Sequence, residues 1–105
     1  MNKRKIISAL TNILAIALRH RIGSIVNNNE IYASKYARDA DVLIKEVQNL
    51  SLKQNWNKED KQEIEKQTKS KLRVELEKKD FIDNKKYALI DEETHKVLSS
   101  LNLLS

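Results

Sequence analysis

Apolar side chains recur at steps of three and four residues along the first part of the chain, from about Lys3 to Val26. Residues at these steps lie on one face of an α-helix, so the pattern predicts an amphipathic helix there. The apolar face is broad, and it consists of Ile6, Ile7, Leu10, Ile13, Leu14, Ala17, Leu18, Ile22, Ile25 and Val26. We therefore expect this helix to be central to the core. Gly23 costs a helix about 1 kcal/mol relative to alanine, so an end or a bend is expected near it.

A second amphipathic helix is predicted from about Glu30 to Leu50, after a break at the three asparagines at 27–29. Its apolar positions approach a heptad repeat and are Tyr32, Tyr36, Ala40, Leu43, Val47 and Leu50. Because small residues at 33, 37 and 40 allow close approach, we expect this helix to lie antiparallel to the first. The two tyrosines are interpreted as core residues rather than as a stacking platform for bases.

A third helix is predicted from the capping residue Asn57, with Asp60 three positions on, to about Lys79. Its apolar positions are Ile64, Leu72, Val74 and Leu76. Because they are so few, we expect most of its surface to lie in water.

The segment after the third helix has two short apolar runs, at 81–82 and 87–90, on either side of a polar turn. This pattern predicts a minimal β-hairpin near 81–90 or a single ordered loop. A final helix is expected to open with Asp91 as its cap, followed by acidic residues that the helix dipole favours. Its apolar face consists of Val97, Leu98, Leu101 and Leu104.

The composition supports an all-α fold. The 105 residues include one glycine and no proline, so the chain has few of the residues that turns between strands need. We expect a single helical domain at 1–105, built as a bundle of about four helices. The absence of cysteine excludes a disulfide framework, a thiolate zinc site and a thiol nucleophile.

The positive charge is confined to the start of the chain. Residues 1–29 hold five basic and no acidic side chains, whereas the rest holds fifteen of each, so the net charge of +5 belongs to the first segment. On one helix the basic residues form two patches roughly 24 Å apart. Each patch could meet the phosphates of a nucleic acid, an anionic membrane surface or a partner, or could simply be solvated. The candidate phosphate or partner contacts are Lys3, Arg4, Lys5, Arg19 and Arg21.

Trp56 is the one aromatic residue within a polar connection. It is interpreted either as a cap on the end of the bundle or as a partly exposed anchor for a partner, since tryptophan is enriched at binding hot spots.

The sequence offers little for catalysis. Its two histidines, His20 and His95, lie in no context that supplies a nucleophile, a base and an orienting group. There is no glycine-rich phosphate loop, and the Glu92-x-x-His95 spacing lacks the second motif that a di-iron site needs. We therefore expect no enzyme activity, no cofactor, no metal and no small-molecule substrate.

The basic residues at 3–5 and the apolar run at 6–18 resemble the start of a secretory signal or a transit peptide. Polar residues interrupt the run, two arginines follow it, and 13 residues are too few to cross a bilayer. We therefore interpret the segment as an integral first helix of an intracellular, cytoplasmic protein that does not act at a membrane. A cleavable N-terminal targeting segment remains the alternative.

The C-terminal third has a second interpretation. The run Leu72-x-x-x-Leu76-x-x-x-x-Phe81-Ile82, the polar turn, Tyr87-Ala88-Leu89-Ile90 and the helix after it resemble the recognition helix, wing and following helix of winged-helix proteins. The resemblance covers about a third of the chain and implies nucleic-acid binding. The helix before the turn departs from that pattern, because six acidic residues accompany its eight basic ones and would repel phosphate.

These observations predict a small, non-catalytic binding or regulatory protein that acts through protein–protein contacts on a helical surface. We expect a homodimer, because the apolar face of the first helix exceeds what the sparse third helix can cover. The alternative is a nucleic-acid-binding module whose basic N-terminal residues contact phosphates.

Overall fold

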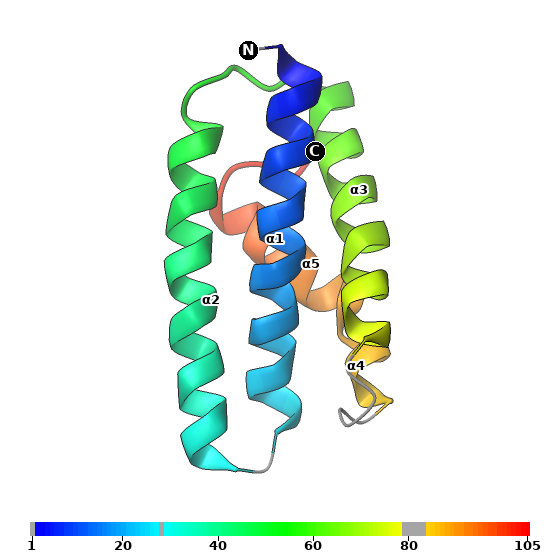
Figure 1. Ribbon diagram of the computed structural model, residues 1–105. Coiled ribbons are helices and arrows are strands. Elements are labelled where there is room, and N and C mark those ends of the chain that lie inside the picture. Colours follow the sequence, from blue (N-terminus) through cyan, green and yellow to red (C-terminus); the bar gives the residue numbers. More distant parts are fainter. Residues whose placement is uncertain (1, 28, 79–83) are drawn as a thin grey trace.

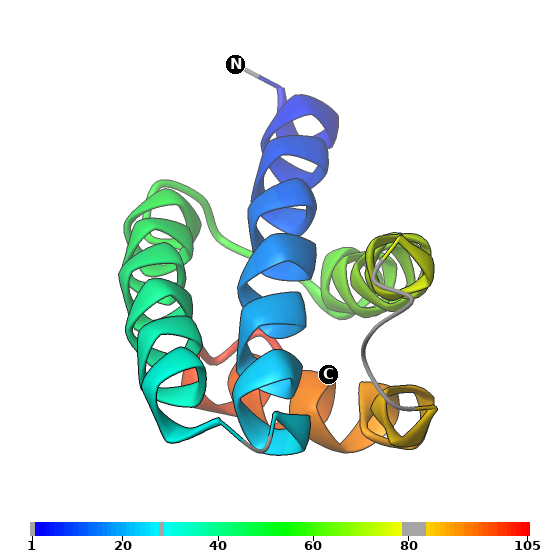
Figure 2. The ribbon, with the colours of Figure 1, turned by 60° about the horizontal axis from the view of Figure 1, so that its bottom comes forward.

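The computed structural model describes residues 2–27, 29–78 and 84–105. Within these ranges the chain is helical and contains no strand, which confirms the all-α prediction. Figures 1 and 2 show how the helices are arranged. They are α1 (Lys3–Val26), α2 (Glu30–Ser51), α3 (Lys58–Glu77), α4 (Lys85–Ala88) and α5 (Ile90–Ser100).

Helix α1 is the centre of the structure. It packs against each of the other four helices, and Figure 2 shows it standing between α2 and α3 with α5 running across it. Its side chains Leu10, Leu14, Leu18 and Ile22 have no solvent-exposed surface. Burying each of them contributes about 1.5 to 3 kcal/mol relative to leaving it in water. The predicted position of this helix in the core is therefore confirmed.

Gly23 does not end α1, contrary to the expectation from its low helix propensity, because the helix continues to Val26. The side chain of Tyr36 from α2 lies over this glycine. A Cβ added at Gly23 would stand 3.3 Å from Cδ2 of the Tyr36 ring. The missing side chain thus allows the ring to pack directly on the α1 backbone.

Helix α2 returns antiparallel to α1 after the predicted asparagine break (Figure 1). Asn27 caps the end of α1, and the Asn29 side chain accepts hydrogen bonds from the backbone N–H groups of Ile31 and Tyr32. Among the described helices, the α2 backbone comes close to α1 alone. Tyr32, predicted to lie in the core, is instead 56% exposed, because no second described helix packs against α2 there.

Helix α3 runs parallel to α1. Three polar contacts join the two helices at nearly constant spacing: Lys3 to Asp60 at 2.7 Å, Thr11 to Gln67 at 3.3 Å and Arg19 to Glu75 at 2.8 Å. The predicted cap is confirmed, since Asn57 and Asp60 form a reciprocal capping box. The inner face of α3 consists of Ile64, Thr68, Leu72 and Leu76.

The minimal hairpin near 81–90 is not confirmed. Residues 81–83 lie outside the described part of the chain, and from residue 84 the chain forms the short helix α4 and then α5. Helix α5 begins at Ile90 without a side-chain cap, so the predicted cap Asp91 instead lies in its first turn. Asn102 ends the helix in the left-handed conformation, with φ of 58°, and the backbone N–H of Leu103 donates to the Leu98 carbonyl.

By length and composition alone, α1 is apolar enough to cross a membrane. In the folded chain, 56% of its apolar window is buried against the other helices, as in the core helix of a globular protein.

Candidate functional site

Intrachain ion pairs engage three of the five predicted basic contact residues. Lys3 pairs with Asp60 at 2.7 Å, Arg19 pairs with Glu75 at 2.8 Å, and Arg21 lies 2.6 Å from a Glu93 oxygen. Each of the three acids lies on a helix other than α1. The acid-free first segment is thus partly neutralised by carboxylates that the fold brings to it.

The pKa of each of the three paired carboxyl groups is lowered, and the causes for Asp60 and Glu75 are similar. The side-chain hydrogen bond from Lys3 is the largest cause of the lowered pKa of Asp60, followed by the backbone hydrogen bond from Asn57. The pKa of Glu75 is lowered mainly by the hydrogen bond from Lys78, with Arg19 adding to it. The lowered pKa favours the ionised form of both carboxyl groups, which is the form that pairs with a basic side chain.

Arg4 and Lys5, the remaining two candidates, are exposed. Neither forms an ion pair with another described residue. They form an uncompensated positive end of α1, and only this part of the predicted cluster keeps its charge available to a partner.

Trp56 is half-buried and packs against the hydrophobic core. Its indole Nε1 donates to the backbone carbonyl of Ser51 at 2.9 Å, and the Lys3 ammonium lies 6.0 Å from the ring centroid. The ring thus closes the end of the bundle where α2, the connection and α1 meet. Its role as an anchor for a partner stays a prediction.

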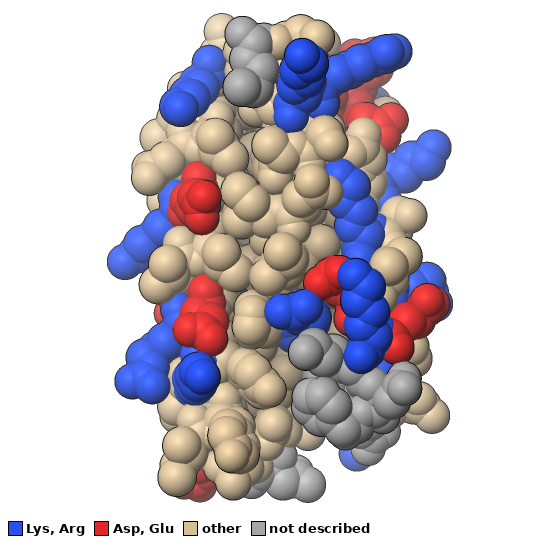
Figure 3. Space-filling view, viewed as in Figure 1, with Lys and Arg blue, Asp and Glu red and all other residues tan. Residues whose placement is uncertain are grey.

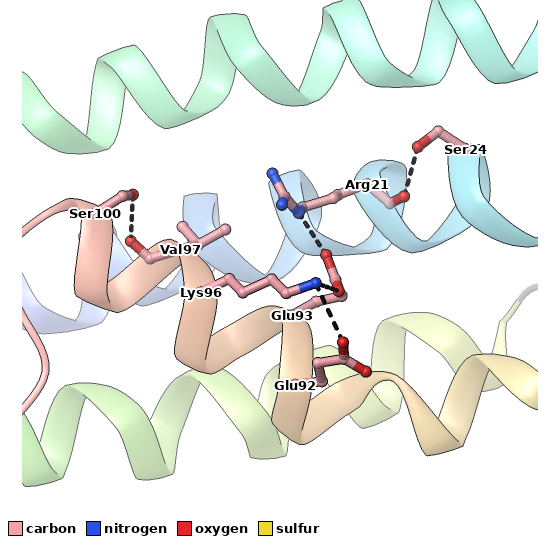
Figure 4. A network of polar contacts seen from close by, with 7 residues as sticks. All are labelled: Arg21, Ser24, Glu92, Glu93, Lys96, Val97 and Ser100. Carbon is pink, nitrogen blue, oxygen red and sulfur yellow. Dashed lines mark hydrogen bonds and ion pairs between the residues drawn. The ribbon is translucent and has the colours of Figure 1, made fainter.

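A buried carboxylate that the sequence analysis did not single out lies at the other end of α1 (Figure 4). Glu93 of α5 is 2% exposed, and it bonds both Arg21 and Lys96. Burial raises the pKa of Glu93, but the hydrogen bonds and charges of Arg21 and Lys96 outweigh that cause, so the net pKa is lowered. Its position in the acidic first turn of α5 and its i,i+3 spacing to Lys96 were the signals in the sequence, and neither of them points to Arg21.

The side of α1 that no other helix covers carries no charge through residues 6–18. Its exposed members are Ser8, Ala9, Asn12 and Ile16. Figure 3 shows the resulting uncharged surface along the middle of this face, with both basic and acidic residues along its borders.

A groove of about 430 Å³ between α1 and α3 continues this uncharged surface. Ile16 is 36% exposed and Val74 is 51% exposed, and they face solvent from the two sides of the groove. Val74 was predicted as one of the apolar positions of α3 but lies outside the core. The groove is lined by Asn12, Ala15, Ile16, Ser70, Lys71, Val74 and Glu75. We name this groove, together with Ser8 and Ala9, the α1–α3 face.

Lys71 is the basic residue of the α1–α3 face. It has no carboxylate partner among the described residues. Its Nζ donates to Thr11 Oγ1 at 2.7 Å and to the Ser8 carbonyl at 3.2 Å, both of them neutral acceptors. Burial lowers the pKa of Lys71. The fold thus holds a partly desolvated positive charge on the edge of an apolar groove.

The described residues form no group of three His, Asp or Glu side chains that could hold a metal ion. A smaller depression of about 210 Å³ lies between α1 and α2, where Arg21 and Asp41 are its charged lining residues. Comparison of the chain with protein-family models, curated proteins and solved structures finds no match.

Proposed function

We propose that this chain is a small, non-catalytic binding or regulatory protein that acts through protein–protein contacts at the α1–α3 face. The observation that supports the proposal most strongly is the absence of charge on the open side of α1. Depletion of charged residues is typical of the centre of a protein–protein interface. Helices α2, α3 and α5 cover α1 from three directions, and the fourth side is left for a partner.

The composition of the α1–α3 face fits this role. Ile16 and Val74 supply an apolar centre, whereas Asn12, Ser70 and Lys71 supply a polar edge. An apolar centre with a polar rim is the usual arrangement of a protein–protein interface. The outer face of α2 differs from it, because the exposed Val42 there stands between charged residues.

Site-specific photocrosslinking in the cells that make the protein tests this proposal. A photoreactive amino acid is placed at Ile16 or Val74, and at Val42 and Lys66 as matched exposed control positions outside the face. We expect a discrete adduct of defined mass from positions 16 and 74 and none from the controls. Equal labelling at all four positions, or none at any, would reject the α1–α3 face as the contact surface.

The mass of the adduct also tests the predicted homodimer. A species of twice 12.2 kDa from position 16, reproduced with the purified chain, identifies a second copy. The dimer was predicted because the apolar face of α1 is broad. The other helices of the same chain cover most of that face, since Leu10, Leu14 and Leu18 are fully buried.

Nucleic-acid binding is the second candidate, and the exposed, unpaired Arg4 and Lys5 favour it. Their patch is small, since Lys3, Arg19 and Arg21 are held by acids of the same chain. A gel-shift titration at 50 and 300 mM salt distinguishes the two functions, because phosphate binding weakens steeply with salt and apolar docking does not. Salt-sensitive binding that Arg4→Gln with Lys5→Gln abolishes would favour the nucleic-acid function.

An intracellular, cytoplasmic location is part of the proposal. The support for it is that α1 is built into the hydrophobic core, whereas a cleaved targeting segment would leave the core residues of the other helices uncovered. Mass determination of the protein isolated from cells tests this. A mature chain that lacks α1 would overturn it.

A further inference from the structure

Among the residues that line the α1–α3 face, the one charge without an intrachain partner of opposite sign is positive. Lys71 has no acid partner among the described residues, and Arg4 and Lys5 have none either. The one acid that lines the groove, Glu75, is neutralised by Arg19 at 2.8 Å and by Lys78 at 3.0 Å. A partner that fills the groove therefore meets the uncompensated positive charge of Lys71 and no uncompensated carboxylate among the lining residues.

We propose that the α1–α3 face binds an acidic amphipathic helix of a partner protein, with a carboxylate on Lys71 and apolar side chains on Ile16 and Val74. This inference rests on the function proposed above and specifies the chemistry of the partner. An apolar helix face laid into a groove between two helices is a common mode of peptide recognition.

Lys71 is suited to receive the carboxylate. An ammonium group has three N–H donors, and the Lys71 ammonium gives two of them to Thr11 Oγ1 and the Ser8 carbonyl. The third donor is left for a group outside the chain. Because the ammonium is partly desolvated, a charge-assisted hydrogen bond there is stronger than one at an open surface.

The positive end of α1 provides a second acidic subsite. Lys5 precedes Ser8 by three residues, so it lies about one helical turn beyond the Lys71 ammonium. An acid one or two turns from the first on the partner helix would reach Arg4 or Lys5. The apolar contacts with Ile16 and Val74 lie on the opposite side of Lys71 along α1, so the partner is expected to be acidic toward one end.

A second copy of this chain fits the face less well. A two-fold axis through the face would place one α1 against the other, and α1 contains no acidic residue. The α1 of one copy would then offer no carboxylate to Lys71 of the other. Such a complex lacks the charge complementarity that an acidic helix supplies.

A displayed library of helical peptides, with all outward positions randomised, tests the inference with the full-length chain as target. We expect selected peptides to combine apolar residues at three- and four-residue steps with Asp or Glu toward one end. Changing the selected Asp or Glu to its amide should weaken binding about tenfold, the effect of one charge-assisted hydrogen bond. This change leaves the target protein untouched.

Variants of the target locate the carboxylate subsite. Lys71→Met removes the charge and keeps an unbranched apolar side chain, so we expect about tenfold weaker peptide binding. Lys66→Met, at an exposed lysine of α3 outside the groove, is the matched control and should leave binding unchanged. Lys71→Glu should reverse the preference toward peptides that carry Lys in place of the acid.

Selection of peptides without acids, equal binding by the wild type and Lys71→Met, or no selection at all would overturn the inference. Such a result leaves the proposed function to its own test, because discrete adducts at positions 16 and 74 would still identify the face as a protein contact. Loss of those adducts would reject the face itself.

Discussion

The Nε of Arg21 lies 2.6 Å from a carboxylate oxygen of Glu93, although the two residues are 72 positions apart in the chain. This ion pair fastens α5 to the C-terminal half of α1 (Figure 4). The two side chains are unequal in burial, since that of Glu93 is 3% exposed and that of Arg21 is 36% exposed. Loss of the pair would therefore destabilise the buried charge of Glu93 more than the partly exposed charge of Arg21. Lys96 forms a second ion pair with Glu93 at 3.2 Å.

Arg21→Met should lower the free energy of unfolding by about 2 kcal/mol, because it leaves a buried carboxylate with only its bond to Lys96. Glu93→Gln should cost less, since a neutral amide is cheaper to bury than a charge. Chemical denaturation of the two single variants and the double variant measures the coupling. If the two effects simply add, Arg21 and Glu93 do not interact in solution.

Acid should destabilise the protein in a defined range of pH. The pKa values of Glu93, Glu75 and Asp60 are lowered by folding, so the unfolded chain binds more protons than the folded one in acid. Their stabilising contribution is complete above the ordinary carboxyl pKa and is lost as the pH falls below about 4. Denaturation midpoints measured from pH 7 to pH 3 should be flat at first and then decline. Glu93→Gln should decline less steeply, and an identical slope would contradict the assignment.

Two buried hydroxyl groups are expected to cost stability rather than add to it. Thr68 of α3 and Thr94 of α5 are fully buried, and their Oγ1 atoms have no hydrogen-bond partner among the described residues. Replacing either threonine by valine keeps the shape and removes an unsatisfied polar atom. Thr68→Val and Thr94→Val should each raise the melting temperature or leave it unchanged. A marked fall would show that an ordered water satisfies the hydroxyl.

The capping box of α3 gives a prediction of opposite sign. Asn57→Ala removes the acceptor for the Asp60 N–H, which is 2.8 Å away, and should cost about 1 kcal/mol. Asn57→Ser keeps a capping oxygen and serves as the control. Equal stability of the two variants would mean that the box does not stabilise α3.

Periodicity and local signals were sufficient to predict three of the longer helices closely. The α1 bounds agree with the prediction, and the Asn57 cap and the asparagine break lie where expected. These features depend on residues within four positions of each other. The hairpin prediction was wrong in its described part because Tyr87 and Leu89 suit a short helix as well as a strand once α3 and α5 are available for packing.

The site could be predicted only in part, because it depends on long-range contacts. The sequence marked Lys3, Arg19 and Arg21 as basic but not the acids that pair with them. These acids are brought alongside α1 by the packing of other helices, Asp60 and Glu75 by α3 and Glu93 by α5. Lys71 carried no distinguishing signal among fifteen basic residues after position 29. Its importance arises from the groove, which only the packing of α1 on α3 creates.

Amide hydrogen exchange on the intact protein tests most directly that α1 is the core around which the chain folds and on which its contact surface is built. The account predicts that backbone N–H groups between Leu10 and Ile22 exchange more slowly than those of the other helices, through global unfolding alone. Rapid exchange throughout α1, with α3 and α5 still protected, would place it outside the folded body and contradict both the fold and the proposed interface.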